Sequence, residues 1–472
     1  MKIKNKFIIS LILIVLASLI SGCNNDDEYI RIEIGMWPES QLTHDIAMFT
    51  TWKERFEKDY PQYKIVPATY TYSVDTIHSK AQSNSLPTVF QTWFTEPKML
   101  IKNGYIRDIS DELKELGWYD KMDVKMKEIL SSEGKVYGVP RDGYGLGLIL
   151  NLEILSFYEI LPDIDGDDKA DLYDEEGNPL YPTTFEDIYQ ICVDINERSE
   201  GDVKGLLVLS SNKNGGWQFA NMAWNFGASL QKQNEEGKWV GNLDDPKAVE
   251  ALEWIQKLAQ EDLLINAVTL AYNDWYTNIG SRVGMAIVGS DVISLAVTNG
   301  GMKLDDIAFI PMPKGPYGDQ YSLFGGTPYV FSSRASDEQV LGALRFLEYI
   351  GRSPETSDVS LKAMEEGYQT AVKKAMPILP TIKAWQNEEY LDAVSELDER
   401  YINVDMKYYQ DFFDTIFDIR HIEEPYYTQE MYGLLDTAIQ AVLSDPDTTN
   451  AKSQLITANS TFNNLYMSKL YR

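Results

Sequence analysis

The chain has 472 residues, of which 44% are hydrophobic and 12% aromatic. This is the composition of a folded globular protein, and the length is enough for two or more domains. The formal net charge is −30, and a surface of that sign repels nucleic acid and anionic lipid, so no nucleic-acid partner is expected.

Residues 1–22 have the features of a secretory signal peptide. Lys2, Lys4 and Lys6 precede an apolar run that is shorter than the ~20 residues that a membrane span needs. The run ends in LISGC, residues 19–23, which resembles the lipobox of bacterial lipoproteins. That resemblance implies cleavage before Cys23, lipid attachment to its thiol and a short tether at 23–29. An ordinary signal peptide that happens to end near a cysteine is the alternative.

Cys192 is then the only free thiol, because the Cys23 thiol would carry the lipid. A disulfide, a redox thiol pair and a cysteine zinc site are therefore excluded. Cys192 lies in a predicted helix, where we expect it to be a small buried apolar residue.

The first part of the mature chain alternates strands and helices. Isoleucines at every second position predict a strand at 30–34, and apolar residues three to four apart predict a helix over 46–56. Further extended runs lie at 64–72 and 88–93, with a helix at 76–83 between them. This alternation is typical of an α/β lobe with a largely parallel sheet, in which ligands bind outside the carboxyl ends of the strands.

Two of these predicted strands end in a tryptophan followed by a glutamate. Trp37 and Glu39 follow the first strand, and Trp93 and Glu96 follow the third. One tryptophan at a strand end usually packs in the core, but two at equivalent positions favour a ligand site. Both interpretations stay open here.

Residues 134–151 form the segment most suggestive of a connection between lobes. Val136–Val139 reads as a short extended run that Pro140 closes, and a second strand follows from Tyr144. Gly145 and Gly147 interrupt this second strand, and glycines inside strands often mark the close approach of a backbone or a ligand. The alternative is an ordinary strand–turn–strand.

The α/β pattern resumes after this segment. Residues 183–186 form a capping box, and Asp245-Pro246 begins another helix. Strands are predicted at 205–210, 283–288, 307–310 and 327–332, and from residue 336 onward the pattern is almost wholly helical. No linker separates the two α/β regions, so we expect interwoven lobes.

A series of motifs in this order resembles a known family. They are WKERFEKDYP, SLPTVFQTW, GYIRDISDEL, GKVYGVPRDGYGLGLILN, MAIVGS, DDIAFIPMPKG and GGTPYVFSS. Together with the lipobox they resemble the extracellular solute-binding proteins of ABC importers, of the carbohydrate type akin to maltose-binding protein. The resemblance implies an α/β, two-lobed periplasmic-binding-protein-like fold of type II, with a multi-strand hinge and the ligand in the cleft.

The resemblance also implies a function and a location. The protein would be a monomeric, lipid-anchored, extracytoplasmic binding protein and not an enzyme. It would capture a sugar or oligosaccharide by hinge closure and pass it to a permease served by a cytoplasmic ATPase. A lipoprotein glycosidase, and a binding protein for a peptide or other non-sugar solute, are the alternatives.

The resemblance gives an approximate division of the chain. The N-terminal lobe would comprise 30–142 plus 302–353, and the C-terminal lobe 143–301 plus 354–472. The first hinge crossing would lie within 134–151, a return near 300–310 and a third near 351–357. Gly145 and Gly147 would then give clearance at the cleft floor.

Sugar binding requires flat apolar faces together with a few placed polar groups. Candidates at loops and strand ends, each with core packing as its alternative, are Trp37, Glu39, Trp93, Glu96, Asp142, Tyr144, Trp217, Trp224, Trp275, Asp291 and Tyr329. Trp385 is added because related proteins often place an aromatic residue from a C-terminal helix in the cleft.

One acidic segment has the spacing of an EF-hand calcium loop. Carboxylates stand at loop positions 1, 3, 5, 9 and 12, and position 7 would supply a backbone carbonyl. Gly166 stands at position 4 instead of 6, and an aspartate replaces the usual final glutamate. A structural Ca²⁺ is expected, with a solvated acidic loop as the alternative, and no organic cofactor is expected. The predicted ligands are Asp163, Asp165, Asp167, Lys169, Asp171 and Asp174.

Chelation tests this calcium prediction. A chelator is expected to lower the melting temperature of the wild-type protein but not that of Asp165→Ala, because the variant has already lost the site. Thermal unfolding with and without chelator measures this, and equal effects on both proteins would count against the loop as a calcium site.

Catalytic motifs are weak in comparison. His44, His78 and His421 are far apart in sequence, and no nucleophile elbow, zinc-protease motif or phosphate-binding glycine loop is present. Glycosidases use two carboxylates, but with 72 acidic residues in the chain the presence of such a pair in the sequence does not indicate an enzyme.

Overall fold

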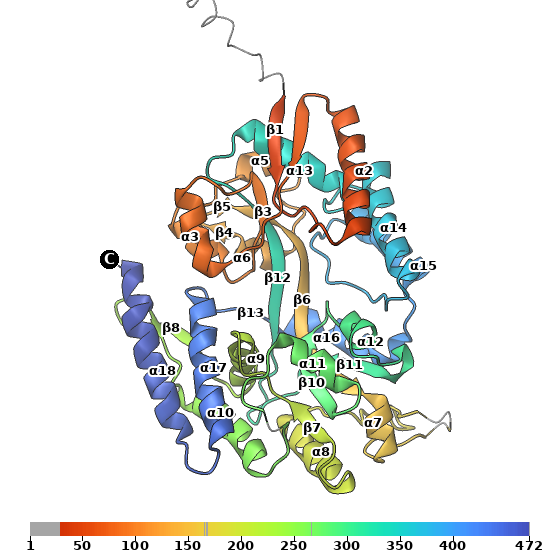
Figure 1. Ribbon diagram of the computed structural model, residues 1–472, viewed down its shortest axis with the longest axis vertical. Helices are drawn as coiled ribbons and strands as arrows, with labels where there is room; N and C mark the ends of the chain where they lie inside the picture. The colour runs from red at the N-terminus through yellow and green to blue at the C-terminus, as the bar shows by residue number, and fades with distance from the viewer. Residues whose placement is uncertain (1–28, 165, 167–168, 266, 472) are drawn as a thin grey trace, which may run out of the picture.

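The computed structural model describes residues 29–164, 166, 169–265 and 267–471. The predicted signal peptide and Cys23 therefore lie outside the described residues. The chain forms two α/β lobes, one above the other in Figure 1, with strands β6 and β12 running from one into the other. None of the helices in the described part is both long and apolar enough to cross a bilayer.

The N-terminal lobe is built on a parallel sheet, as predicted. β1 (Ile30–Ile34) lies between β2 (Tyr63–Pro67) and β3 (Val89–Gln91) and pairs with both in parallel. Ile32 and Ile34 are fully buried while Arg31 and Glu33 face out, so the alternation seen in the sequence sets the sheet's inner face. The other elements of this lobe are α2 (Thr43–Asp59), α3 (Val74–Gln82), α4 (Pro97–Lys102), α5 (Ser110–Glu115), α6 (Val124–Ile129), β4 (Ser131–Ser132), β5 (Lys135–Val136), α13 (Asp337–Tyr349), α14 (Asp358–Lys373) and α15 (Glu388–Tyr401).

The first hinge strand is β6 (Gly138–Asn151), a single strand of 14 residues. Its first half pairs with β12 (Ser322–Phe331), and its second half pairs with β10 (Val283–Gly289) and β11 (Ile307–Pro311) in the C-terminal lobe. The strand continues through Pro140, which the sequence predicted as its end. The pairing with β12 shifts by one residue at this point, and Arg141 is the extra residue of the resulting bulge.

The return crossing is β12, not the segment at 300–310. β12 pairs with β3 at its N-lobe end and with β13 (Arg420–Ile422) at its other end. β11 instead pairs with the C-lobe half of β6, so the segment that contains it lies in the C-terminal lobe. Sequence periodicity marks both segments as buried strands but does not say which one crosses.

The third crossing also lies later than expected. α14 packs on α13 and α15, and the Glu366 carboxylate of α14 accepts hydrogen bonds from Trp52 and Arg55 of α2. Residues 354–401 therefore pack with the N-terminal lobe, and the chain crosses again just before η2 (Met406–Tyr408), which contacts β11.

The C-terminal lobe surrounds β10, β11 and β7 (Lys204–Leu207) with helices. Asp245 caps α10 with Pro246 at its first position, as predicted, whereas the capping box of α8 pairs Thr184 with Asp187, one residue later than predicted. Cys192 is fully buried, also as predicted. The remaining elements are α7 (Leu152–Phe157), α8 (Phe185–Arg198), α9 (Asn214–Asn225), β8 (Gln231–Gln233), β9 (Trp239–Gly241), α10 (Pro246–Gln260), α11 (Tyr272–Ile279), α12 (Ser294–Thr298), η1 (Leu304–Asp306), α16 (Gln410–Ile419), α17 (Thr428–Ser444), α18 (Ala451–Leu465) and η3 (Met467–Tyr471).

The hinge glycines serve packing and give no room to a cleft. A Cβ on Gly145 would lie 2.2 Å from Ile416 Cδ1, and one on Gly147 would lie 2.5 Å from Phe309 Cζ. The expected clearance is therefore filled by side chains of the C-terminal lobe.

Candidate functional site

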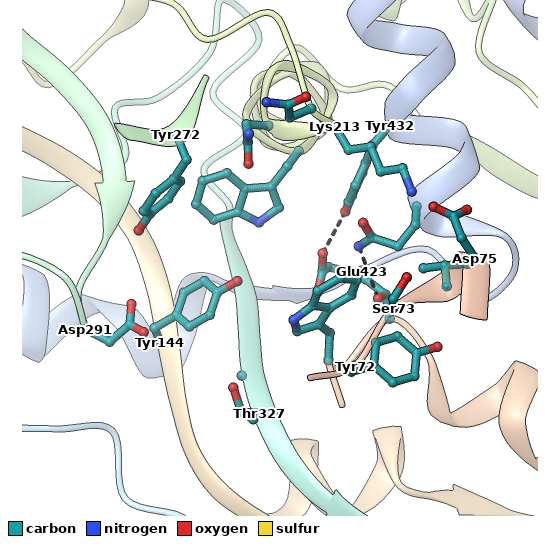
Figure 2. Close-up of a pocket in the computed structure, with 18 residues that line it drawn as sticks. Tyr72, Ser73, Asp75, Tyr144, Lys213, Tyr272, Asp291, Thr327, Glu423 and Tyr432 are labelled. Atoms are coloured by element: carbon teal, nitrogen blue, oxygen red, sulfur yellow. Dashed lines mark hydrogen bonds between the residues drawn. The ribbon is translucent and has the colours of Figure 1, made fainter. Parts of the chain in front are cut away.

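A cavity of about 610 Å³ lies between the two lobes. The N-terminal lobe lines it from the start of α3 and the end of β3, and the C-terminal lobe lines it from α9, α11 and α17. β6 and β12 contribute Tyr144 and Thr327 (Figure 2). The residues that line the cavity therefore come from distant parts of the chain, and both lobes contribute to it.

The N-lobe wall combines an accessible ring with a buried carboxyl group. Trp93 is 41% exposed and meets the Tyr72 ring edge-on at 5.1 Å. The Tyr72 hydroxyl donates a 2.5 Å hydrogen bond to the buried Glu96, which also accepts one from Thr95. Burial raises the pKa of Glu96, although these two donors offset part of the rise. Glu96 lies behind the cavity wall and fixes the position of the Tyr72 ring through this hydrogen bond.

The C-lobe wall is the N-terminus of α9, which a residue from α17 caps. Lys213 precedes the helix with a left-handed backbone at φ 70° and gives no side-chain cap. The buried Asp436 takes over this role by accepting hydrogen bonds from the backbone nitrogens of Lys213 and Gly216, at 2.5 and 2.7 Å. A Cβ on Gly216 would lie 2.2 Å from the Tyr432 carbonyl oxygen, so only glycine lets the two helices approach this closely. This contact fixes Trp217, one residue further along α9.

Three aromatic side chains meet at the hinge end of the cavity. Trp217 lies 6.2 Å from the Tyr144 ring and 6.4 Å from the Tyr272 ring, measured between centroids. The Tyr144 side chain crosses the neighbouring strand over Gly325, where a Cβ would lie 2.2 Å from its ring. The cavity thus has an aromatic floor at its hinge end, to which the hinge strands contribute Tyr144.

A buried carboxyl group faces the cavity from the segment after β13. The Tyr432 hydroxyl donates a 2.7 Å hydrogen bond to Glu423 Oε1 (Figure 2). Burial raises the pKa of Glu423 from 4.5 to about 8, and the hydrogen bond from Tyr432 opposes that rise. Burial likewise raises the pKa of the adjacent Glu424 to about 7 and that of Asp291, which also lines the cavity, to about 6. Glu423 is therefore mostly protonated at neutral pH and can donate a hydrogen bond to a ligand.

Glu423 should make the protein less stable as the pH rises. Between its unfolded pKa of 4.5 and its folded pKa of about 8, the folded state holds a proton that the unfolded state releases. The free energy of unfolding is expected to fall by on the order of a few kcal/mol from pH 5 to pH 8.5, since one unit of pKa corresponds to ~1.4 kcal/mol. Chemical unfolding of wild type and Glu423→Gln at both pH values measures this. The variant should show a clearly flatter dependence, and equal slopes would contradict the prediction.

Four of the residues proposed from the sequence line this cavity: Trp93, Tyr144, Trp217 and Asp291. Tyr329, which is 2% exposed, lines a second cavity under α2 and α14. Glu96 lies behind the first cavity, where it accepts hydrogen bonds from Tyr72 and Thr95. Asp142 is paired with Arg141, which lines the second cavity. Glu39 is exposed, and Trp37 packs on Phe49. Trp224, Trp275 and Trp385 are buried in the core, each against another ring.

Most of the lining residues were not proposed from the sequence, among them Tyr72, Lys213, Tyr272, Glu423 and Tyr432. Tyr72 is the last residue of a predicted strand, so the rule for strand ends could have included it. Glu423 and Tyr432 follow a strand of three residues in a region that looks helical in the sequence, and no local pattern marks them.

The predicted calcium loop is only partly described. Asp165 and Asp167 lie outside the described residues. Asp163 and Asp171 accept hydrogen bonds from the backbone nitrogens of Gly166 and Ile164, and Asp174 accepts three from its own turn. Within the described residues, no three acidic, histidine or cysteine side chains gather as a metal-ligand set. Calcium binding stays a prediction.

Comparison with known proteins identifies the family. The family described as bacterial extracellular solute-binding protein matches residues 51–388, more than half of the chain. The chain belongs to this family. Its members serve as solute-binding proteins of ABC importers, which confirms the fold class and the general function predicted from the sequence. A search of curated protein sequences gives no match.

Solved structures show the same two-lobed fold at low sequence identity. The GacH receptor of Streptomyces glaucescens, solved with acarbose, matches with TM-score 0.66 and 17% identity over 94% of this chain and 99% of its own. Maltose-bound MalE3 of T. maritima gives 0.62 and 17%, over 94% and 99%. UgpB of Mycobacterium tuberculosis, in complex with glycerophosphocholine, gives 0.64 and 11%, over 92% and 96%.

Proposed function

We propose that this solute-binding protein captures an uncharged sugar or short oligosaccharide in the cavity between its lobes. The observation that carries the proposal is the pair Trp93 and Trp217, one from each lobe, which line the same cavity and each contact a tyrosine ring. GacH and MalE3, two of the structural relatives, are described with acarbose and maltose, which supports a sugar ligand.

The chemistry of the cavity fits a neutral sugar better than an acidic one. A pyranose ring offers C–H faces to aromatic rings and hydroxyl groups to placed polar side chains. Glu423 as a protonated acid and Thr327 can exchange hydrogen bonds with hydroxyls. Asp75 and Asp291 would repel a carboxylate on the sugar, and Lys213 alone among the lining residues carries a positive charge.

Capture would proceed by closure about β6 and β12. The two tryptophans belong to different lobes, so a ligand that touches both favours the closed arrangement by its contacts with each. Gln429 of α17 already donates a 3.3 Å hydrogen bond to Thr95 across the cavity. The closed form would then be recognised by the permease of the importer.

Membrane attachment forms a finer part of the proposal. The LISGC segment at 19–23 supports lipid modification of Cys23, which would tether the protein outside the cytoplasm. Labelling with a radioactive or clickable fatty acid in a bacterial host, with Cys23→Ala as control, tests this. Equal labelling of both proteins would exclude the anchor.

A calorimetric ligand panel tests the sugar proposal. Neutral di- and oligosaccharides are expected to bind and to raise the melting temperature, since a ligand at 100 times its Kd stabilises by ~2.7 kcal/mol. Matched uronic acid sugars should bind more weakly, and unrelated peptides should not bind. Binding of peptides without any sugar, or turnover of a labelled oligosaccharide, would overturn the proposal in favour of a peptide-binding protein or a glycosidase.

A further inference from the structure

A second cavity of about 600 Å³ lies on the other side of the hinge strands, under α2 and α14. In Figure 1 these helices stand on the opposite side of β6 and β12 from α3 and α17, which border the first cavity. Its walls are mainly apolar and rich in methionine, with Met48 and Trp52 from α2 and Met364 from α14. Polarisable thioethers and aromatic rings adapt to a range of apolar ligand shapes. The two cavities share one lining residue, Asp291, and the proposed sugar site does not otherwise use this one.

Arg141 enters this cavity because of the bulge in β6. The strand register shifts opposite Thr327 and Pro328, which leaves Arg141 as the extra residue between two paired ones. Its Nε donates a 2.7 Å hydrogen bond to Asp142, and its side chain is 31% exposed. Its two terminal nitrogens have no hydrogen-bond partner in the part of the chain that the structure describes.

Arg352 reaches the same cavity from the end of α13. Gly351, with φ 68°, ends the helix in a Schellman motif: its nitrogen bonds to the Glu348 carbonyl and the Arg352 nitrogen to the Leu347 carbonyl. This motif fixes where Arg352 leaves the helix. Among the described residues, no side chain or carbonyl accepts a hydrogen bond from its guanidinium.

The two guanidinium groups act on the same tyrosine. Burial raises the pKa of the Tyr329 hydroxyl, and Arg352 and Arg141 both offset part of that rise. Arg352 has the same effect on Tyr368 and Tyr390, which also line the cavity. Arg141, Arg352 and Tyr329 all line this cavity, so the two guanidinium groups border the same space.

The charge balance is the reverse of that in the first cavity. Three cations, Arg141, Arg352 and Lys383, line it with one acid, Asp291. Arg141 is paired with Asp142 and Lys383 with Asp398, both at 2.7 Å, so among the described residues Arg352 is the lining cation without an ion pair. Planar guanidinium groups with free N–H donors match the two oxygens of a carboxylate. Apolar walls with a few convergent polar groups, in a volume of several hundred Å³, are typical of small-molecule sites.

We propose that the second cavity binds a small organic carboxylate with an apolar body, of the arylalkanoate type, whose carboxylate contacts Arg141 and Arg352. The apolar body lies against the methionine and aromatic side chains of α2 and α14. This site is distinct from the sugar site and does not depend on the sugar being the transported solute.

Calorimetry with 3-phenylpropanoate and its neutral isostere 3-phenylpropanamide tests the proposal. The acid is expected to bind the wild-type protein at least 10-fold more tightly than the amide. Arg352→Gln, at an exposed position, should remove most of this difference, and Arg141→Gln should do the same. Arg345→Gln, a half-buried arginine on α13 outside the cavity, should leave it unchanged.

The outcomes separate this site from the sugar site. Neutral oligosaccharides should bind Arg352→Gln within 2-fold of wild type and should not displace the acid. Equal affinity for acid and amide, full retention of acid binding in Arg352→Gln, or displacement by a sugar would each overturn the second site. Failure of all sugars to bind would leave these comparisons intact and would count against the proposed function alone.

Discussion

Replacing Trp217 with alanine is expected to weaken sugar binding about 30-fold or more, because a well-packed aromatic contact residue contributes ~2 kcal/mol or more to binding. Trp217 stands at the α9 N-terminus and packs on Tyr144 and Tyr272 at the hinge end of the cavity. Its loss would remove a stacking face and leave the floor rings less constrained. Isothermal titration calorimetry with the best neutral oligosaccharide measures the effect.

Trp93→Ala should behave in the same way, at little cost in stability, because this side chain is 41% exposed. Trp239→Ala is the matched control. Trp239 is a half-buried tryptophan on β9 that packs on Tyr426 and lines neither cavity. Affinity unchanged in both Trp93→Ala and Trp217→Ala would place the ligand elsewhere.

Replacing Arg420 with alanine is expected to lower the free energy of unfolding by about 3–5 kcal/mol, the usual loss when one partner of a buried ion pair is removed. Arg420 Nη1 lies 2.9 Å from Asp123 Oδ2, with side-chain exposures of 10% and 0%. Asp123 belongs to the N-terminal lobe, where it also caps α6, and Arg420 begins β13 at the C-lobe end of β12. The pair therefore joins the lobes beside the hinge, and its loss leaves a buried carboxylate without its cation.

Arg400→Ala provides the contrast. Arg400 pairs with Glu365 at 3.1 Å, but their side chains are 57% and 32% exposed, so a change of about 0–1 kcal/mol is expected. Urea unfolding of both variants at one pH compares them. Similar small losses would show that the Asp123–Arg420 pair is compensated by Gln386, which also donates to Asp123.

Two tryptophans at equivalent strand ends show where local sequence stops being informative. Trp37 and Trp93 follow β1 and β3 with similar neighbours, so both were proposed to face a ligand. Only Trp93 lines the cavity between the lobes, because Phe49 of α2 covers Trp37, with ring centroids 5.4 Å apart. Which ring stays free depends on a helix that packs against it, and no pattern within the strand records that.

In the hinge, too, the sequence indicated the strand but not the packing around it. Residues 134–151 suggested a strand passing between lobes, and β6 does so, yet its glycines accommodate Ile416 and Phe309 and give no clearance to a ligand. Pro140 suggested a strand end, but β6 continues past it, because the bulge at Arg141 shifts the pairing with β12 by one residue. The resemblance placed the return crossing near 300–310, but both segments read as buried strands in the sequence, and only the pairing of β11 and β12 distinguishes them.

The sequence by itself determined the α/β class, most helices and strands, and the family, since periodicity and motif order are local properties. It also indicated Trp93, Tyr144, Trp217 and Asp291 for the site. Only the tertiary structure decided that Glu423 and Tyr432 join them and that the bulge in β6 exposes Arg141 to a second cavity. These residues are distant in the chain, and their burial and pKa arise from neighbours that meet only when the lobes pack around β6 and β12.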